Sequence, residues 1–316
     1  MSKHGSHALD NRQAGFIGLG NRFPFHLPPS YPMLLVPGVM LRTDPAGVAS
    51  PVVFDVPRSG TWYPCDFRPD ASFQDVHRSV SMYLHELYSV VPTAGATLLY
   101  ALFPNAYIDA NRHETDVDPE LLSDEWAGPG ILNPTVKSKL GIGLIHSAAG
   151  NNSLYDGKLT AADVRNRIEN YFLPYHDELA RIISEQRKAS PASYHISCHS
   201  MASIGGRSTL DAGSPRSDID IGDLNGKSCS PELSKLVEET FKRHGYRVTS
   251  NFHYAGAECV TRHGDPESGR HSLQIEVNRK LYMDEESLTR NAGFSELQKA
   301  IADLAGALKE FAAHRG

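Results

Sequence analysis

The run from Ser193 to Met201 limits the possible folds more than any other stretch of the sequence. It is apolar enough for a buried strand, yet it ends in the polar side chains of His199 and Ser200. A long helical pattern precedes it, and a loop rich in Gly, Ser, Arg and Asp follows at residues 205–222. In sheets of mostly parallel strands, ligands bind at the carboxyl ends, where the connecting loops leave a crevice. We therefore expect His199 to lie at such a crevice.

Further apolar runs predict other strands of the same sheet, and amphipathic patterns between them predict helices. The expected strands are residues 52–56, 96–103, 246–250 and 273–277, and the expected helices are residues 73–91, 160–183, 231–244 and 294–311. Because strands alternate with helices, the sequence predicts an α/β fold: a single three-layer domain in which helices flank a mixed central sheet. The long loop at residues 128–157 is a candidate lid.

The first 45 residues are expected to form an extended N-terminal arm, and the domain is expected to span residues 46–316. The arm contains a proline-rich run at residues 23–32, and proline cannot continue a regular helix because it fixes φ and lacks an amide hydrogen. The last amphipathic helix either packs on the sheet or pairs with a second copy, which leaves a homo-oligomer open.

Composition argues against several classes of function. The chain has 316 residues, a formal net charge of −6 and no long basic run, so it is not expected to bind the phosphate backbone of nucleic acids. No apolar window is long enough to span a membrane. The N-terminus has no apolar signal core, which makes a cytoplasmic protein the expectation. The four cysteines are too scattered for a disulfide framework and are expected to be reduced thiols.

Four short segments carry polar residues at the expected ends of strands. In chain order they are residues 54–60 (FDVPRSG) followed by Tyr63-Pro64, residues 107–112 (YIDANR), residues 198–201 (CHSM) and residues 274–283 (QIEVNRKLYM). In this order and spacing they resemble the N-formylglutamate amidohydrolase family. That family is similar to the zinc carboxypeptidase and aspartoacylase group, so the resemblance implies a mixed sheet with a zinc or other divalent metal ion at the strand ends. It also implies hydrolysis of a small carboxylated amide such as N-formylglutamate.

The resemblance further implies roles for individual residues. His199 would be a metal ligand, and Glu276 would be the general base that moves protons during amide hydrolysis. Asn111 and Arg112 would hold the substrate, since a planar guanidinium binds a carboxylate through two hydrogen bonds. The site would be completed by Arg58 and Asn105 as catalytic residues and by Tyr254 and Arg279 as substrate-binding residues.

The chain departs from the family pattern at the metal site. Arg58 stands where the family has a histidine, and arginine offers no lone pair to a cation. Ser81 and Ser197 stand where acidic residues are common, and Asn105 stands where an arginine is common. A rebuilt metal site would need other histidines, for which the candidates are His77, His85, His113 and His253.

Three functions are open at this point. The first is an amide hydrolase whose metal site is rebuilt or weakened. The second is a pseudoenzyme that binds a carboxylated ligand with Arg112 but has lost metal and turnover. The third is a metal-free enzyme in which the charge of Arg58 takes the place of the metal. The same residues also have purely structural alternatives: an ion pair of Asp109 with Arg112, and an ion pair of Glu276 with Arg279 or Arg270.

Overall fold

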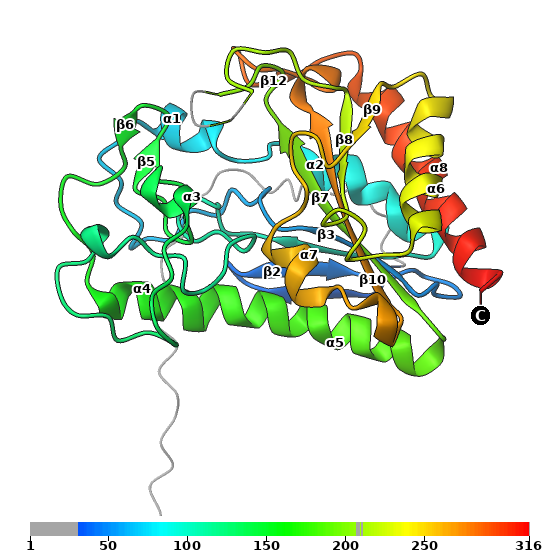
Figure 1. Ribbon diagram of the computed structural model, residues 1–316, viewed down its shortest axis with the longest axis horizontal. Helices are drawn as coiled ribbons and strands as arrows, with labels where there is room; N and C mark the ends of the chain where they lie inside the picture. The colour runs from blue at the N-terminus through cyan, green and yellow to red at the C-terminus, as the bar shows by residue number, and fades with distance from the viewer. Residues whose placement is uncertain (1–30, 207–208, 210, 316) are drawn as a thin grey trace, which may run out of the picture.

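A mixed sheet of eight strands forms the centre of the protein (Figure 1). The computed structural model describes residues 31–206, 209 and 211–315. The strands are β1 Met33–Val36, β2 Met40–Thr43, β3 Val52–Val56, β4 Thr97–Ala101, β7 Ser193–Met201, β8 Ile219–Gly222, β9 Val248–Ser250 and β10 Arg270–Asn278. Their order in the sheet is β1-β2-β4-β3-β7-β10-β8-β9. Strands β4, β3, β7 and β10 are parallel to one another, whereas β2 and β8 are antiparallel to their neighbours β4 and β10.

Helices cover both faces of this sheet, which confirms the expected three-layer α/β fold (Figure 1). The long helix α5 (Leu173–Ala189) packs on one face, where it continues from α4 (Ala161–Arg167). Helices α6 (Pro231–Arg243) and α8 (Phe294–Ala313) pack together on the other face. Each face has its own apolar core, so the sheet is buried on both sides.

Shorter elements complete the chain. They are α1 Phe73–Arg78, α2 Leu84–Leu87, α3 Val136–Lys139, α7 Glu258–His263, the strand pairs β5 Ala148–Ala149 with β6 Asn152–Ser153 and β11 Met283–Asp284 with β12 Thr289–Arg290, a π turn at Ile168–Phe172, and 3-10 turns at Tyr88–Ala94, Pro119–Leu121, Pro266–Ser268 and Arg279–Leu281. Within the described part of the chain, no helix is both long enough and apolar enough to cross a membrane.

The sheet begins earlier in the chain than the sequence predicted. Strands β1 and β2 form an antiparallel pair at the edge of the sheet, inside the stretch expected to be an extended arm, and β2 pairs with β4. The turn between them contains Pro37 and Gly38, with a φ of 75° at Gly38, a combination that suits a tight turn. The expected boundary near residue 45 is therefore too late, because the hairpin is paired into the sheet. Residues 1–30 of the predicted arm lie outside the described residues.

The predicted helix at residues 73–91 is broken, and contacts from distant parts of the chain explain the break. The chain forms α1, turns, and then forms α2 and a 3-10 turn. Arg279 donates to the carbonyls of Arg78 at 2.9 Å and Val80 at 3.2 Å. The main-chain N–H of Ser81 donates to the carbonyl of Arg58 at 2.8 Å. These bonds replace those of a continuous helix, although Val76, Val80, Leu84 and Leu87, four of the apolar positions that suggested it, remain buried.

The neighbouring strands β7 and β10 present polar side chains on the face covered by α5 and α7. In their parallel register, Gln274 lies beside Ser197 and Glu276 lies beside His199. Residues two apart on a strand point to the same face, so the alternation predicted for β10 is confirmed. The opposite face of the two strands packs in the core beneath α8 through Ile196, Cys198, Leu273, Ile275 and Val277. A row of buried polar groups therefore runs along the sheet toward its carboxyl edge.

Asp55 of β3 is the centre of a buried hydrogen-bond network in this row. Its carboxylate bonds to His195 Nε2 at 2.9 Å and accepts from the Tyr175 hydroxyl at 2.8 Å. His195 Nδ1 bonds to the Ser272 hydroxyl at 2.7 Å. Burial alone would raise the pKa of Asp55, but the hydrogen bond and charge of His195 outweigh burial and lower the pKa to about 2. An ionised carboxylate thus joins β3, β7 and α5 from within.

Replacing Asp55 with alanine should lower the free energy of unfolding by about 3–5 kcal/mol, because His195 and Tyr175 would stay buried without their acceptor. Urea unfolding at pH 7, followed by circular dichroism, measures the change. Asp177→Ala, at an exposed position of α5, is the matched control and should change the free energy by less than about 0.5 kcal/mol. If Asp55→Ala costs no more than the control, the network contributes nothing to stability.

Candidate functional site

The predicted site residues His199 and Glu276 meet at the carboxyl ends of β7 and β10. They are direct neighbours in the register of the two strands, which places their Cα atoms about 4.8 Å apart with both side chains on the same face. The side chains are buried, with 1% of His199 and 5% of Glu276 exposed. Asp220 of β8 is the neighbour of Glu276 on the other side. The expectation that the histidine and the glutamate share one face is confirmed.

Asn111 bridges these strands from the loop that follows β4. Its Oδ1 accepts from the main-chain N–H of Cys259 in α7 at 2.9 Å, and this bond fixes the orientation of the amide. Its Nδ2 is therefore the donor that lies 3.3 Å from His199 Nε2 and 3.3 Å from Gln274 Oε1. Gln274 in turn donates from Nε2 to Glu276 Oε1 at 3.0 Å. A continuous chain of hydrogen bonds thus connects α7, Asn111 and Glu276.

These contacts determine the protonation of His199. Because Asn111 Nδ2 can only donate, His199 Nε2 accepts, and Ser197 Oγ lies 3.0 Å from the same nitrogen. The ring proton is then on Nδ1, which is buried and has no hydrogen-bond partner among the described residues. Burial, together with the nearby charge of Arg58, lowers the pKa of His199 to about 3. His199 is a neutral imidazole with an unused Nδ1–H donor.

Arg58 is held by a two-pronged ion pair with Asp109. Its Nε donates to Oδ1 at 2.8 Å and its Nη2 donates to Oδ2, which is a strong geometry for a guanidinium and a carboxylate. The same carboxylate lies 3.3 Å from His146 Nε2 and accepts from the main-chain N–H of Asn111 at 3.0 Å. Burial alone would raise the pKa of Asp109, but the charge of Arg58 outweighs it and holds the pKa far below its usual range. Asp109 pairs with Arg58, so the alternative pairing with Arg112 is not observed.

The turn that carries Arg58 requires glycine at position 60. A Cβ on Gly60 would lie 2.2 Å from the main-chain oxygen of Phe103 and 2.4 Å from the carbonyl carbon of Leu102, closer than such atoms can approach. The backbone after β3 therefore runs directly against the end of β4. This close approach brings Arg58 and the loop that carries Asp109 to the same end of the sheet.

Glu276 is a buried carboxyl that forms no ion pair with any described residue. The two arginines considered as its partners, Arg270 and Arg279, bond to other groups. Burial raises the pKa of Glu276 to about 7, although the positive charge of Arg58 acts in the opposite direction. A carboxyl with such a pKa exchanges its proton near neutral pH, which is the property that a general base needs.

Arg112 lies within range of the charges of Arg58, Asp109 and Glu276 and is held by main-chain carbonyls. Its Nε donates to Ile142 at 3.1 Å and its Nη1 donates to Asn111 at 2.9 Å. No carboxylate among the described residues forms an ion pair with it. Lys137, a half-buried residue of α3 whose charge lies near that of Arg112, was not among the residues predicted from the sequence. Its only sequence signal was its place in the long loop at residues 128–157.

The remaining predicted site residues, Tyr254, Arg279 and Asn105, differ in burial and in hydrogen bonding. Tyr254 is half-buried, with the guanidinium of Arg216 5.3 Å from its ring centre, and burial followed by the charge of Glu276 raises its pKa. Arg279 donates to Ser200 Oγ at 3.2 Å and to two carbonyls, so it clamps the end of β10. Asn105 is buried, and its Oδ1 has no hydrogen-bond partner among the described residues. The substrate-binding and catalytic roles of these residues stay predictions.

The donor set around His199 does not fit a zinc ion. A zinc site needs about three or four ligand atoms with a free lone pair, but Nδ1 of His199 carries the ring proton and the guanidinium of Arg58 offers no lone pair. The histidines considered for a rebuilt site bond elsewhere: His77 to Tyr63, His85 to Ser59, His113 to Thr115 and His253 to Asp211. In the described ranges, no group of three or more His, Cys, Asp and Glu ligand atoms includes His199.

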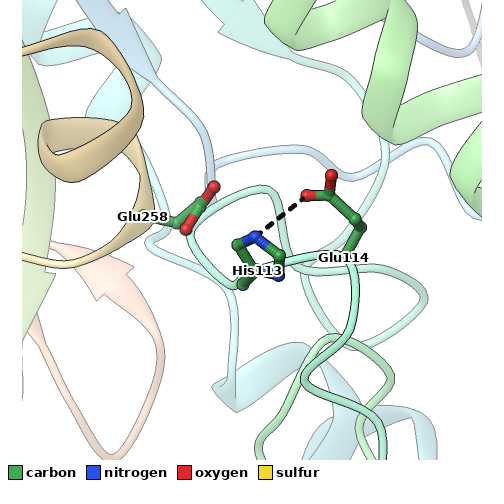
Figure 2. A group of neighbouring side chains, drawn as sticks. All are labelled: His113, Glu114 and Glu258. Carbon is green, nitrogen blue, oxygen red and sulfur yellow. Dashed lines mark ion pairs between the residues drawn. The ribbon is translucent and has the colours of Figure 1, made fainter. Parts of the chain in front are cut away.

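One group of residues with ligand-like spacing lies where the loop after β4 meets α7 in the described part of the chain. His113, Glu114 and Glu258 place their ligand atoms within 4.8 Å of one another (Figure 2). Arg262 already binds both carboxylates, that of Glu258 at 2.6 Å. His113 Nδ1 accepts from the main-chain N–H of Thr115 at 3.2 Å. The ring proton is therefore on Nε2, which lies 3.9 Å from Glu114 Oε2. A cation would have to displace Arg262, and the group is an ion-paired surface cluster.

Known proteins resemble this chain along most of its length. A family model described as N-formylglutamate amidohydrolase matches residues 50–283. The chain is 25% identical over 205 residues to N-formylglutamate deformylase of Pseudomonas putida, which covers 64% of this chain and 70% of that protein. It is 26% identical over 227 residues to N-formylglutamate deformylase of Pseudomonas aeruginosa, which covers 69% of this chain and 77% of that protein.

A solved structure extends this comparison to the fold. The crystal structure of N-formylglutamate amidohydrolase from Ralstonia eutropha JMP134 has a TM-score of 0.82 and 36% sequence identity to this chain. The match covers 88% of this chain and 99% of that chain. Since the family model spans most of the sequence and this relative shares the fold, the chain belongs to the N-formylglutamate amidohydrolase family.

Proposed function

We propose that the crevice binds a small N-acyl amino acid and hydrolyses its amide bond, with N-formylglutamate as the first substrate to test. The observation that carries this proposal is Glu276, a buried carboxyl with a pKa of about 7. It lies in one site with the fixed guanidinium of Arg58 and the unused Nδ1–H of His199. The names of the relatives, N-formylglutamate deformylase and amidohydrolase, supply the choice of acyl group.

In the proposed reaction, Glu276 accepts a proton from a water molecule as that water attacks the carbonyl carbon of the substrate. Negative charge then develops on the carbonyl oxygen. The guanidinium of Arg58 and the Nδ1–H of His199 would stabilise that charge. Asp109 fixes Arg58 before the substrate arrives, and preorganised groups of this kind need no reorganisation during the reaction.

The C–N bond breaks when the proton held by Glu276 passes to the amide nitrogen. The water thereby supplies the hydroxyl of the released acid and a hydrogen of the released amine, and the products are formate and the free amino acid. Arg112 would hold a carboxylate of the substrate throughout. These steps use only the side chains described, because the donor set around His199 does not fit a metal ion.

A second candidate function is ligand binding without turnover. It is favoured by the internal bonding of the site, since Glu276 Oε1 already accepts from Gln274 and Arg58 is bonded to Asp109. Both functions would use Arg112 to hold a carboxylate. Binding alone therefore does not separate them, whereas release of formate does.

The wild-type protein should release formate from N-formylglutamate, and the rate should be insensitive to metal chelators. A divalent ion at His199 would face the charge of Arg58, and each unit of like charge costs on the order of 4 kcal/mol at about 4 Å and an effective dielectric near 20. A formate assay with and without chelator tests the rate, and elemental analysis of the purified protein tests for zinc.

Two results would contradict this expectation. Stoichiometric zinc, with hydrolysis abolished by chelator and restored by zinc, would return the protein to a metal-dependent mechanism. Binding of N-formylglutamate without any release of formate would favour the second candidate function.

The pH dependence of hydrolysis should follow the proton on Glu276. Because only the deprotonated carboxylate accepts a proton, kcat/KM should rise around pH 7 and level off above it. Glu276→Gln should lower kcat by about 100- to 10,000-fold, whereas Glu267→Gln, at an exposed position, should leave it unchanged. If kcat/KM instead rises at about pH 4.3, the ordinary pKa of glutamate, and is constant from there through pH 7, the base is not a glutamate with a raised pKa.

Replacing Arg112 with alanine should weaken the binding of carboxylated ligands by roughly 2–5 kcal/mol, the range for loss of one partner of a desolvated charge pair. Calorimetric titration with glutamate, the amino acid product, measures this change. Arg243→Ala, at an exposed position of α6 on the opposite face of the sheet, serves as the control. Unchanged affinity in a correctly folded Arg112→Ala protein would mean that Arg112 only supports its loop.

A further inference from the structure

Lys137 of α3 is a half-buried lysine without a counter-ion. Its side chain forms no hydrogen bond and no ion pair with any residue that the structure describes. Burial lowers its pKa, and the positive charges of Arg112, Arg58 and Arg216 lower it further. A partly desolvated ammonium group near three guanidinium groups is unfavourable unless an anion lies between them. The arrangement therefore indicates a position for an anion.

Main-chain hydrogen bonds place Lys137 next to Arg112. The carbonyl of Lys137 accepts from the N–H of Ile142 at 2.9 Å, and the carbonyl of Ile142 accepts from Arg112 Nε at 3.1 Å. The start of α3 is also fixed, because the carboxylate of Asp116 accepts from the N–H of Thr135 at 2.7 Å and from its hydroxyl at 3.0 Å. The main chain of Lys137 and the side chain of Arg112 are therefore joined through hydrogen bonds to the same residue, Ile142.

Most of the nearby acidic side chains are already bound to other groups. Asp211 is the acidic residue whose charge partly offsets the effect of the arginines on Lys137, and its carboxylate accepts from Arg216 Nε at 2.8 Å. Of the acids whose charges act on Arg112, Asp109 and Asp116 are bonded to Arg58 and Thr135. The third, Glu276, forms no ion pair with a described residue and is the proposed proton acceptor of the reaction. Arg112 and Lys137 are thus neighbouring cations that have no ionic partner among the described residues.

We infer that Lys137 is the specificity-determining residue of this site and binds a second carboxylate, the one on the side chain of the substrate, while Arg112 binds the first. This assignment rests on the proposed function for the position of the scissile amide. A guanidinium binds a carboxylate through two directed hydrogen bonds, whereas an ammonium on a flexible stem acts as a point charge. Arg112 therefore suits the carboxylate at a fixed distance from the amide, and Lys137 suits the carboxylate on a flexible side chain.

N-formylglutamate and N-formylglutamine test this assignment, because they have nearly the same size and differ in side-chain charge. The wild-type kcat/KM should favour N-formylglutamate by about 10- to 100-fold, the range for a hydrogen bond between charged groups. Lys137→Met should abolish this preference, mainly through KM. Lys139→Met removes an exposed lysine from the same short helix and should keep the preference.

Binding of glutarate and of butyrate, measured by calorimetry, tests Lys137 without turnover. If the wild-type protein hydrolyses neither formyl compound, the proposed reaction fails. Tighter binding of glutarate that is lost in Lys137→Met and kept in Lys139→Met would still support the assignment. Three results would show that Lys137 is not the determinant. Either Lys137→Met keeps the wild-type preference for the dicarboxylate in one of the two measurements, or the wild-type protein shows no such preference. The third is a loss of the preference in Lys139→Met that equals the loss in Lys137→Met.

Discussion

The ion pair between Arg58 and Asp109 holds the rest of the crevice in position. It joins the turn after β3 to the loop after β4, and the same carboxylate accepts the main-chain N–H of Asn111. Asn111 then reaches His199 on β7 and Gln274 on β10. Removing one partner of a buried ion pair typically costs about 3–5 kcal/mol, because the other charge stays buried. Arg58 is therefore an integral part of the hydrogen-bond network that joins Asp109 and Asn111 to the two strands.

Local sequence patterns predicted much of the fold. The alternation in β10 placed Glu276 on the face opposite the apolar side chains of its strand, because residues two apart share a face. The helix expected from residue 160 begins there, where Thr160 and Asp163 form a capping box at the start of α4. The break within residues 73–91 could not be predicted, since the group that takes the helix carbonyls comes from Arg279, far along the chain. Helical spacing reports burial, and it does not report such competition for main-chain groups.

The sequence predicted the members of the candidate site better than their contacts. His199 and Glu276 meet as expected, but the pairing of Asp109 with Arg58 depends on how two loops approach each other. Lys137 has no motif around it. The proposed role of Lys137 depends on the charges of guanidinium groups that three separate segments bring near it. The sequence alone does not show that these segments lie close together.

The clamp formed by Arg279 has a consequence for how the crevice works. Arg279, three residues after Glu276, donates to the carbonyl of Val80. The main-chain N–H of Ser81, the residue after Val80, donates to the carbonyl of Arg58. The backbone segments that carry Glu276 and Arg58 are thus tied together by hydrogen bonds. The separation of Glu276 from Arg58 therefore depends on hydrogen bonds made by other residues, so a substitution at Arg279 would alter the spacing of the site without touching either side chain.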